Sequence, residues 1–201
     1  FWLVGLEFYR VLFGPVWLYS YIITSMVTFI LPGYSPKNKD WAQDVAKNLK
    51  LGHDLRPVFW GHWDDPEKTF KPKEKAQDVI DVLLKDNANI IAKSVGTFVA
   101  AFVVAKIPDR INKVILCGIP SVTSERLEVF KSAFANFPPE KVICFQNTKD
   151  PWATYTEVKE FMAKVNPKIR VFEKPRSDHH YPYYEDFNKF LAKVEGERNG
   201  N

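Results

Sequence analysis

The sequence has few of the residues that build disulfide frameworks and metal sites. Only two of its 201 residues are cysteines, Cys117 and Cys144, and each lies inside an apolar run with no partner at metal-ligand spacing. We expect both to be buried, reduced thiols, as is typical of cytoplasmic proteins. Among the four histidines, His53 and His62 lie in polar loops and form no cluster with cysteine, so the sequence predicts no metal site.

Glycine is also scarce, and long blocks of like charge are absent. None of the nine glycines forms a phosphate-binding loop: Gly33 and Gly96 stand alone, and the GxGxxG pattern is missing. The sequence therefore predicts no cofactor. The 28 basic and 24 acidic residues are interspersed and leave a net charge of +4. We interpret this as a solvated surface that indicates anionic substrates or membranes only weakly and does not indicate nucleic-acid binding.

The first part of the chain has almost no charge. Glu7 and Arg10 are the only charged residues before residue 31, and residues 11–31 just reach the length of about 20 apolar residues that a membrane span needs. A Gly-Pro pair at positions 14 and 15 interrupts a helix there, however, and residues 27–31 are better interpreted as a strand.

We therefore predict that Met26 is the natural start of the chain. Residues 1–25 are then an apolar upstream extension or the remnant of an anchor, and residues 26–201 form one domain. We expect a cytoplasmic protein, or a membrane-anchored one if residues 1–25 are native. Contact with a membrane is expected only through these residues.

From residue 26 on, short apolar runs alternate with helical patterns. Strands are predicted at residues 27–31, 56–60, 89–92, 113–118, 142–145 and 169–172, and helices at residues 40–49, 73–85, 98–104, 121–137, 155–165 and 183–194. This alternation predicts an α/β protein with three α/β/α layers around a mostly parallel sheet of about six strands.

One junction between a strand and a helix has an unusual sequence. Residues 92–96 read Ala-Lys-Ser-Val-Gly, between an apolar run and a buried helix. A serine between small residues at such a turn is typical of a nucleophile elbow, because the two backbones pass very close there. The alternative is that Ser94 only caps a helix. Lys93, its neighbour, is expected to point into solvent.

The loops after the strands bring further reactive groups to the same edge of the predicted sheet. Ser94 follows the third strand, Asp150 the fifth, and the loop after the sixth contains Asp178, His179 and His180. A serine becomes a nucleophile when a histidine takes its proton, and a carboxylate supports the resulting positive charge. Alternatives remain: Asp150 can be a turn former, His180 can be the base, and Asp178 is another acid.

The chain resembles the α/β-hydrolase superfamily from Met26 to Val194. The matching segments are residues 31–35, Leu-Pro-Gly-Tyr-Ser, the segment 92–96, the pair 150–151, Asp-Pro, and residues 177–179, Ser-Asp-His. Its small size is similar to that of nearly lidless serine hydrolases of the retinoblastoma-binding protein nine type. Two positions depart from the usual pattern, because Pro32 stands where many relatives have His and Ala92 replaces the first elbow glycine.

The resemblance implies a serine hydrolase acting on a small ester, thioester or amide. Ser94 would be the nucleophile, Asp150 the orienting acid and His179 the base, and the backbone N–H groups of Tyr34 and Val95 would form the oxyanion hole.

Weaker candidates for contact with the small acyl substrate are Gly33, Trp63 and His180. The second hypothesis is a hydrolase-fold binding or interaction module without turnover, which the departures at Pro32 and Ala92 motivate. The sequence does not determine the oligomeric state.

Overall fold

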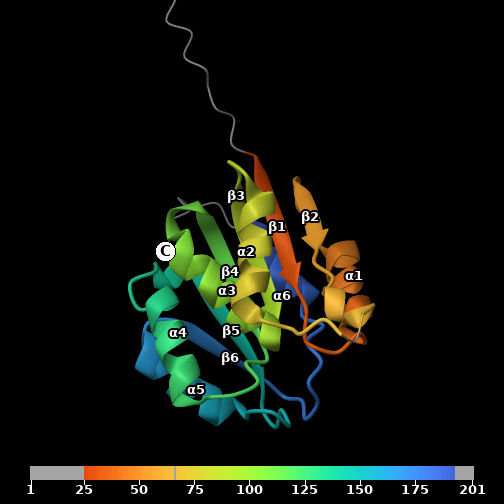
Figure 1. The fold of residues 1–201 in the computed structure, drawn as a ribbon. Coiled ribbons are helices and arrows are strands. Elements are labelled where there is room, and N and C mark those ends of the chain that lie inside the picture. Colours follow the sequence, from red (N-terminus) through yellow and green to blue (C-terminus); the bar gives the residue numbers. More distant parts are fainter. Residues whose placement is uncertain (1–24, 66, 193–201) are drawn as a thin grey trace, which may run out of the picture.

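A six-stranded parallel sheet forms the centre of the computed structural model, which describes residues 25–65 and 67–192 (Figure 1). The strand order is β2-β1-β3-β4-β5-β6, and all five pairings are parallel. The strands are β1 (Met26–Leu31), β2 (Asp54–Pro57), β3 (Asn87–Lys93), β4 (Ile111–Cys117), β5 (Val142–Asn147) and β6 (Arg170–Lys174). The predicted fold class is confirmed, with a sheet that is wholly parallel in the described residues.

Helices cover both faces of the sheet. They are α1 (Asn38–Asn48), α2 (Pro72–Leu83), α3 (Val95–Lys106), α4 (Ser124–Phe134), α5 (Tyr155–Val165) and α6 (Tyr184–Ala192), with short 3-10 turns η1 (Gly61–Trp63), η2 (Pro108–Arg110) and η3 (Pro139–Lys141). One buried cluster joins the sheet to α2, α3, α4 and α5, and a second joins it to α1 and α6. Figure 1 shows α2 and α3 in front of the sheet and α6 behind it.

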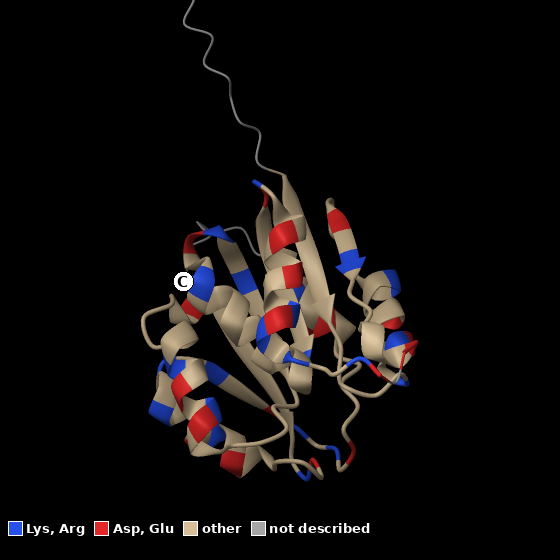
Figure 2. Ribbon diagram, in the orientation of Figure 1, with Lys and Arg blue, Asp and Glu red and all other residues tan. Residues whose placement is uncertain are grey.

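The two-sided cover explains the apolar strands. In β3, Ile90 faces the cluster of α2 to α5 and Ile91 faces that of α1 and α6, because successive side chains of a strand point to opposite faces. Cys117 and Cys144 are buried free thiols, as predicted. Charged residues of both signs are interspersed over the helices, except on α3, whose only charged residue is Lys106 (Figure 2).

The predicted second strand, residues 56–60, is wrong at its carboxyl end. β2 ends at Pro57, and Phe59 and Trp60 belong to the loop that follows. β2 is an edge strand with a single neighbour, β1, so little holds its end in the ladder. Trp60 instead turns inward and is 1% exposed.

Residues 1–24, most of the predicted extension, lie outside the described residues, and so do residues 193–201 at the other end. Within residues 25–65 and 67–192, no helix has the length and apolar character needed to cross a membrane.

Lys93 is buried, so its expected position in solvent is wrong. It is 6% exposed, and its Nζ donates to Asn38 Oδ1 at 2.6 Å and lies 5.6 Å from the ring centre of Trp41. The reason is the two-residue period of β3, which turns Lys93 toward α1. Burial lowers the pKa of Lys93 to about 8, although Cys117, Asp150 and Asp178 act in the opposite direction.

The start of α3 packs directly against the end of β1. A Cβ atom added to Gly96 would lie 2.2 Å from the carbonyl oxygen of Leu31 and 2.8 Å from that of Pro32. These partners are backbone atoms and cannot rotate away. The glycine is therefore required by the close approach of two backbone segments, which places the turn around Ser94 beside the loop after β1.

We expect Gly96→Ala to lower the free energy of unfolding by at least the about 1–3 kcal/mol typical of overpacked sites, because the backbone itself must move. Chemical denaturation measures the change. Gly52→Ala is the matched control, since nothing lies within 4 Å of an added Cβ there. Equal stability of the two variants would contradict the close approach at Gly96.

The burial of Lys93 also predicts a pH dependence of stability. An unfolded lysine titrates near about 10.4. Between about pH 8 and that value the unfolded chain binds more protons than the folded chain, so this residue makes stability rise with pH. Relative to Lys93→Met, the wild type should gain on the order of 3 kcal/mol across this window. Denaturation of both proteins from pH 7 to 10.5 checks this, and a constant difference would contradict it.

Candidate active site

Ser94 stands at a strained turn between β3 and α3. Its backbone has φ 56° and ψ −126°, a region that costs a residue with a side chain on the order of 1–2 kcal/mol. Hydrogen bonds hold the turn: the Ser94 N–H donates to the Cys117 carbonyl at 3.0 Å, and the Thr97 N–H and hydroxyl donate to the Ser94 carbonyl at 3.0 and 2.6 Å. The Ser94 side chain forms no capping hydrogen bond, so the alternative of a simple helix cap is wrong.

The loop after β5 buries a carboxylate that accepts three hydrogen bonds. Asp150 is 2% exposed, and its Oδ2 accepts from His179 Nδ1 and from the Tyr181 hydroxyl, each at 2.6 Å. Its Oδ1 accepts from the Trp152 N–H at 2.9 Å. Burial alone would raise the pKa of Asp150, but these three hydrogen bonds, with the charge of His179, hold the pKa below its usual value. The carboxylate therefore stays ionised beside the imidazole.

Tyr181 is a partner of Asp150 that the sequence analysis missed. The residue is fully buried, and its hydroxyl oxygen also accepts from the Asn147 N–H at 3.2 Å. Burial and the hydrogen bond to Asp150 raise the pKa of Tyr181 well above its usual value, so the hydroxyl remains a donor. Its position two residues after His179 in a short loop is the only sequence signal that could have indicated it.

The second ring nitrogen of His179 is left available. Nε2 is buried and has no hydrogen-bond partner among the described residues, Ser94 Oγ included. The ring stands against Gly118, whose φ is +59°, and a Cβ there would lie 2.9 Å from His179 Cε1. Gly118 directly follows Cys117, whose carbonyl binds Ser94. Ser94 and His179 therefore both lie against the backbone of residues 117–118, where only glycine leaves room for the rings of Tyr181 and His179.

The competing acid and base candidates lie elsewhere. The Asp178 carboxylate pairs with the Arg176 guanidinium and accepts the His180 N–H at 3.1 Å. The His180 side chain is exposed, and its charged neighbours include Lys93, Arg176 and Asp178. Burial, Lys93 and Arg176 lower the pKa of His180. Asp150 and His179 are thus the acid and histidine that the fold pairs.

Two backbone N–H groups beside the elbow have no acceptor within the described part of the chain. They belong to Val95, the first residue of α3, and to Tyr34, in the loop after β1. The first turn of a helix presents free N–H groups and a partial positive charge, which favour a developing anion. These are the N–H groups that the sequence analysis predicted for an oxyanion hole, and that role stays a prediction.

The three weaker candidates for substrate contact are Gly33, Trp63 and His180, and two of them form hydrogen bonds within the protein. Gly33 is buried, and its carbonyl accepts from Trp60 at 3.2 Å, while the Trp63 indole donates to the Tyr34 carbonyl at 2.6 Å. The Gly33 carbonyl and the Trp63 indole N–H are thus engaged within the protein. His180 is exposed, and Lys93 of the elbow segment is among its charged neighbours. In residues 25–65 and 67–192, no group of His, Cys, Asp and Glu side chains gathers closely enough to hold a metal ion.

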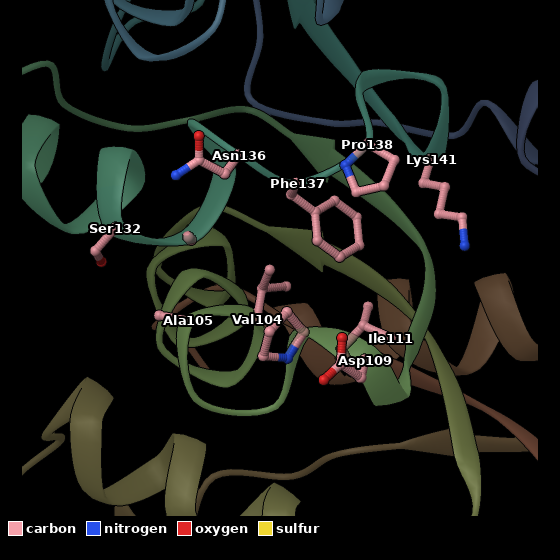
Figure 3. A pocket seen from close by; sticks show the side chains of 11 residues that line it. Val104, Ala105, Asp109, Ile111, Ser132, Asn136, Phe137, Pro138 and Lys141 are labelled. Carbon is pink, nitrogen blue, oxygen red and sulfur yellow. The ribbon is translucent and has the colours of Figure 1, made fainter.

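A cavity of about 430 Å³, whose lining residues Figure 3 shows, includes none of these groups. Its lining includes Val104 near the end of α3, Ile111 at the start of β4 and Phe137 after α4. These residues mark the amino ends of the strands, whereas Ser94, Asp150 and His179 follow carboxyl ends. In parallel α/β sheets ligands bind at the carboxyl ends, so we place the candidate site there and not in this cavity.

Comparison with known proteins gives structural neighbours only. Neither a family model nor a curated protein sequence matches the chain. An α/β hydrolase from a Medee basin deep-sea metagenome library is similar with a TM-score of 0.61 and 14% identity, over 88% of this chain and 93% of that one. A lidless α/β serine hydrolase from Xanthomonas campestris reaches 0.60 at 13% identity, over 86% and 82%.

The mouse α/β hydrolase domain-containing protein 10 is similar with a TM-score of 0.59 and 14% identity, over 83% of this chain and 88% of that one. At such identities a likeness establishes architecture and not activity. The strand order, the two helical layers and these neighbours together lead to one conclusion: the chain has the α/β-hydrolase fold.

Proposed function

We propose that the chain is a serine hydrolase that cleaves a small ester, thioester or amide through an acyl-enzyme. The observation that carries the proposal is the hydrogen bond between His179 Nδ1 and the buried Asp150 carboxylate, which leaves His179 Nε2 without a partner among the described residues. A histidine held in this way has the tautomer and the electrostatic support that a general base needs.

The proposed reaction begins when Ser94 Oγ attacks the acyl carbon and transfers its proton to His179 Nε2. The ionised Asp150 stabilises the imidazolium, and the negative charge on the carbonyl oxygen develops near the N–H groups of Val95 and Tyr34. His179 then protonates the leaving group. A water molecule, activated by the same histidine, attacks the acyl-enzyme and releases the acid and Ser94.

The edge of the site supports a small or accessible acyl group. The connection from β4 to α4 spans only residues 118–123, which leaves no room for a helical lid at that point. Exposed aromatic rings stand along the edge: Tyr34 is 55% exposed and Trp152 is 67% exposed, with its ring centre 6.4 Å from that of His179. Such rings favour apolar substrate groups.

One observation favours the second hypothesis, a module without turnover. Ser94 Oγ and His179 Nε2 form no hydrogen bond. In hydrolases without substrate this bond is often long and tightens on binding, so the gap agrees with catalysis as well. The two sequence departures do not remove a reacting group. Ala92 is fully buried under α3, and the Pro32 carbonyl accepts from Trp60 at 3.2 Å.

Labelling with a fluorophosphonate tests the proposal. We expect one covalent adduct on Ser94 in the folded wild type and none in Ser94→Ala, because only an activated serine attacks the phosphorus. Ser124→Ala, at an exposed serine that opens α4, is the matched control and should label like the wild type. Folded wild type without label, and without turnover of p-nitrophenyl esters, would favour the binding module.

Substitution of the two aspartates separates the proposed acid from its neighbour. Asp150→Asn should lower kcat/KM by about 10³- to 10⁴-fold, because the amide no longer supports the imidazolium or its tautomer. Asp178→Asn removes a carboxylate next to His179 in sequence that pairs with Arg176, and kcat/KM should fall less than about tenfold. Ester hydrolysis measures both, and a larger loss in Asp178→Asn would contradict the assignment.

A further inference from the structure

The loop that carries the Tyr34 N–H is held by ring nitrogens from the segment after β2. The Trp60 indole N–H donates to the carbonyl oxygens of Pro32 and Gly33, each at 3.2 Å. Trp60 is 1% exposed and packs edge-on against Phe70, with ring centres 5.3 Å apart. An indole that is almost completely buried has little freedom to rotate, so its N–H is a fixed donor.

The next carbonyl of the loop is held in the same way. The Tyr34 carbonyl accepts from Trp63 Nε1 at 2.6 Å and from His62 Nε2 at 2.8 Å. The acceptor is a carbonyl, so this His62 nitrogen bears the proton. The Tyr34 ring stacks on His62 at 4.5 Å and contacts Phe70 at 5.7 Å. Three successive carbonyls, of residues 32–34, thus face the aromatic rings.

The orientation of these carbonyls decides where the N–H groups point. In a trans peptide the C=O of one residue and the N–H of the next point in opposite directions. Because the Gly33 carbonyl faces Trp60, the Tyr34 N–H in the same peptide faces away from it. Glycine adopts both signs of φ, so without a fixed partner this peptide could turn over. It would then present a carbonyl oxygen where the proposed oxyanion forms.

Asn38 holds the opposite side of the loop. Its side chain fills the space in which a Cβ of Gly33 would stand, 2.8 Å away, and its Nδ2 donates to the Ser35 carbonyl at 2.9 Å. The buried Lys93 ammonium fixes Asn38 in turn, through the bond of 2.6 Å to Oδ1. The loop is therefore confined between an aromatic cluster and an amide, and the indole of Trp60 holds the orientation of the 32–33 and 33–34 peptides.

We propose that Trp60 is a positioning residue that sets the oxyanion hole by holding the Gly33–Tyr34 peptide with its N–H toward the substrate, and that Trp63 supports it at the next peptide. The role rests on the proposed hydrolase function. Neither indole touches the reacting atoms, so both act through the Tyr34 N–H.

Trp60→Phe is the direct test, because it keeps an aromatic ring and removes the N–H. For an ester substrate, kcat should fall by about 10- to 100-fold with little change in KM, less than the about 10²- to 10³-fold typical of deleting a donor outright. A thionoester develops charge on sulfur, which these donors stabilise poorly. The ratio of ester to thionoester turnover should therefore fall in Trp60→Phe, a result that lost packing alone would not produce.

Trp41→Phe is the matched control. Trp41 is also buried and donates its indole N–H to a backbone carbonyl, that of Tyr181 at 3.0 Å, on the other face of the sheet. Its removal should lower the melting temperature and leave the ratio of ester to thionoester turnover unchanged. If Trp60→Phe does not fold, Trp63→Phe takes its place, because Trp63 is only partly buried. An unchanged ratio in the folded variant would overturn the proposal.

Backbone amide NMR separates this inference from the proposed function. The Gly33 and Tyr34 amide signals should be single in the wild type and should split or broaden in Trp60→Phe, because the peptide plane between these residues can then flip. This measurement requires no catalytic activity, so unchanged signals overturn the positioning role of Trp60 even in an inactive protein. A wild type that fluorophosphonate does not label overturns the hydrolase function and, with it, the catalytic meaning of the loop.

Discussion

The close approach of α3 to the end of β1 is the constraint on which the rest of the site depends. Because Gly96 has no side chain, the helix packs directly against the carbonyl groups of Leu31 and Pro32, and no room is left for a Cβ atom. The turn at Ser94 and the loop to Tyr34 are therefore parts of one backbone contact. Each of the two N–H groups proposed for the oxyanion hole comes from one side of this contact, so backbone packing brings the two segments together, and the Trp60 indole is proposed to orient the Tyr34 N–H.

Two buried charges flank this contact, and each is stabilised differently. The Asp150 carboxylate receives three hydrogen bonds, which hold its pKa below the usual range despite burial. The Lys93 ammonium donates one hydrogen bond, to Asn38, and contacts the ring of Trp41. These two contacts do not compensate for burial, which lowers the pKa of Lys93. The well-bonded anion can support a positive imidazole. The poorly bonded cation costs stability, and its contact with Asn38 links it to the loop after β1.

Much of the fold and part of the candidate site could be predicted from the sequence. The period of apolar residues indicated the six strands and the six α-helices, although not the true end of β2, because helices on both sides make the inner strands largely apolar. Asp150 and His179 were found by position, since the carboxyl ends of parallel strands meet at one edge of the sheet. Their mutual hydrogen bond is a consequence of that topology, although they are 29 residues apart.

What the sequence analysis missed depends on contacts between distant segments. Tyr181 matters because its hydroxyl reaches Asp150, and Gly118 because the rings of Tyr181 and His179 fill its Cβ position. Trp60 matters because its indole reaches Pro32, 28 residues away. Local patterns contain no such information. Lys93 was misjudged for a related reason: a charge beside a turn suggests solvent, but the strand period directs that side chain under α1.

The same contacts explain why Pro32 and Ala92 are compatible with the geometry of the proposed site. Ala92 pairs with Leu31 and Leu116 in the sheet and lies under α3. Its side chain is small enough for α3 to pack against β3, so a glycine is not needed at this position. Pro32 fixes its own φ and leaves a carbonyl that Trp60 binds. A loop without the usual histidine is thus ordered from the β2 side by aromatic N–H donors. The departures change what holds the site together and leave its reacting groups in place.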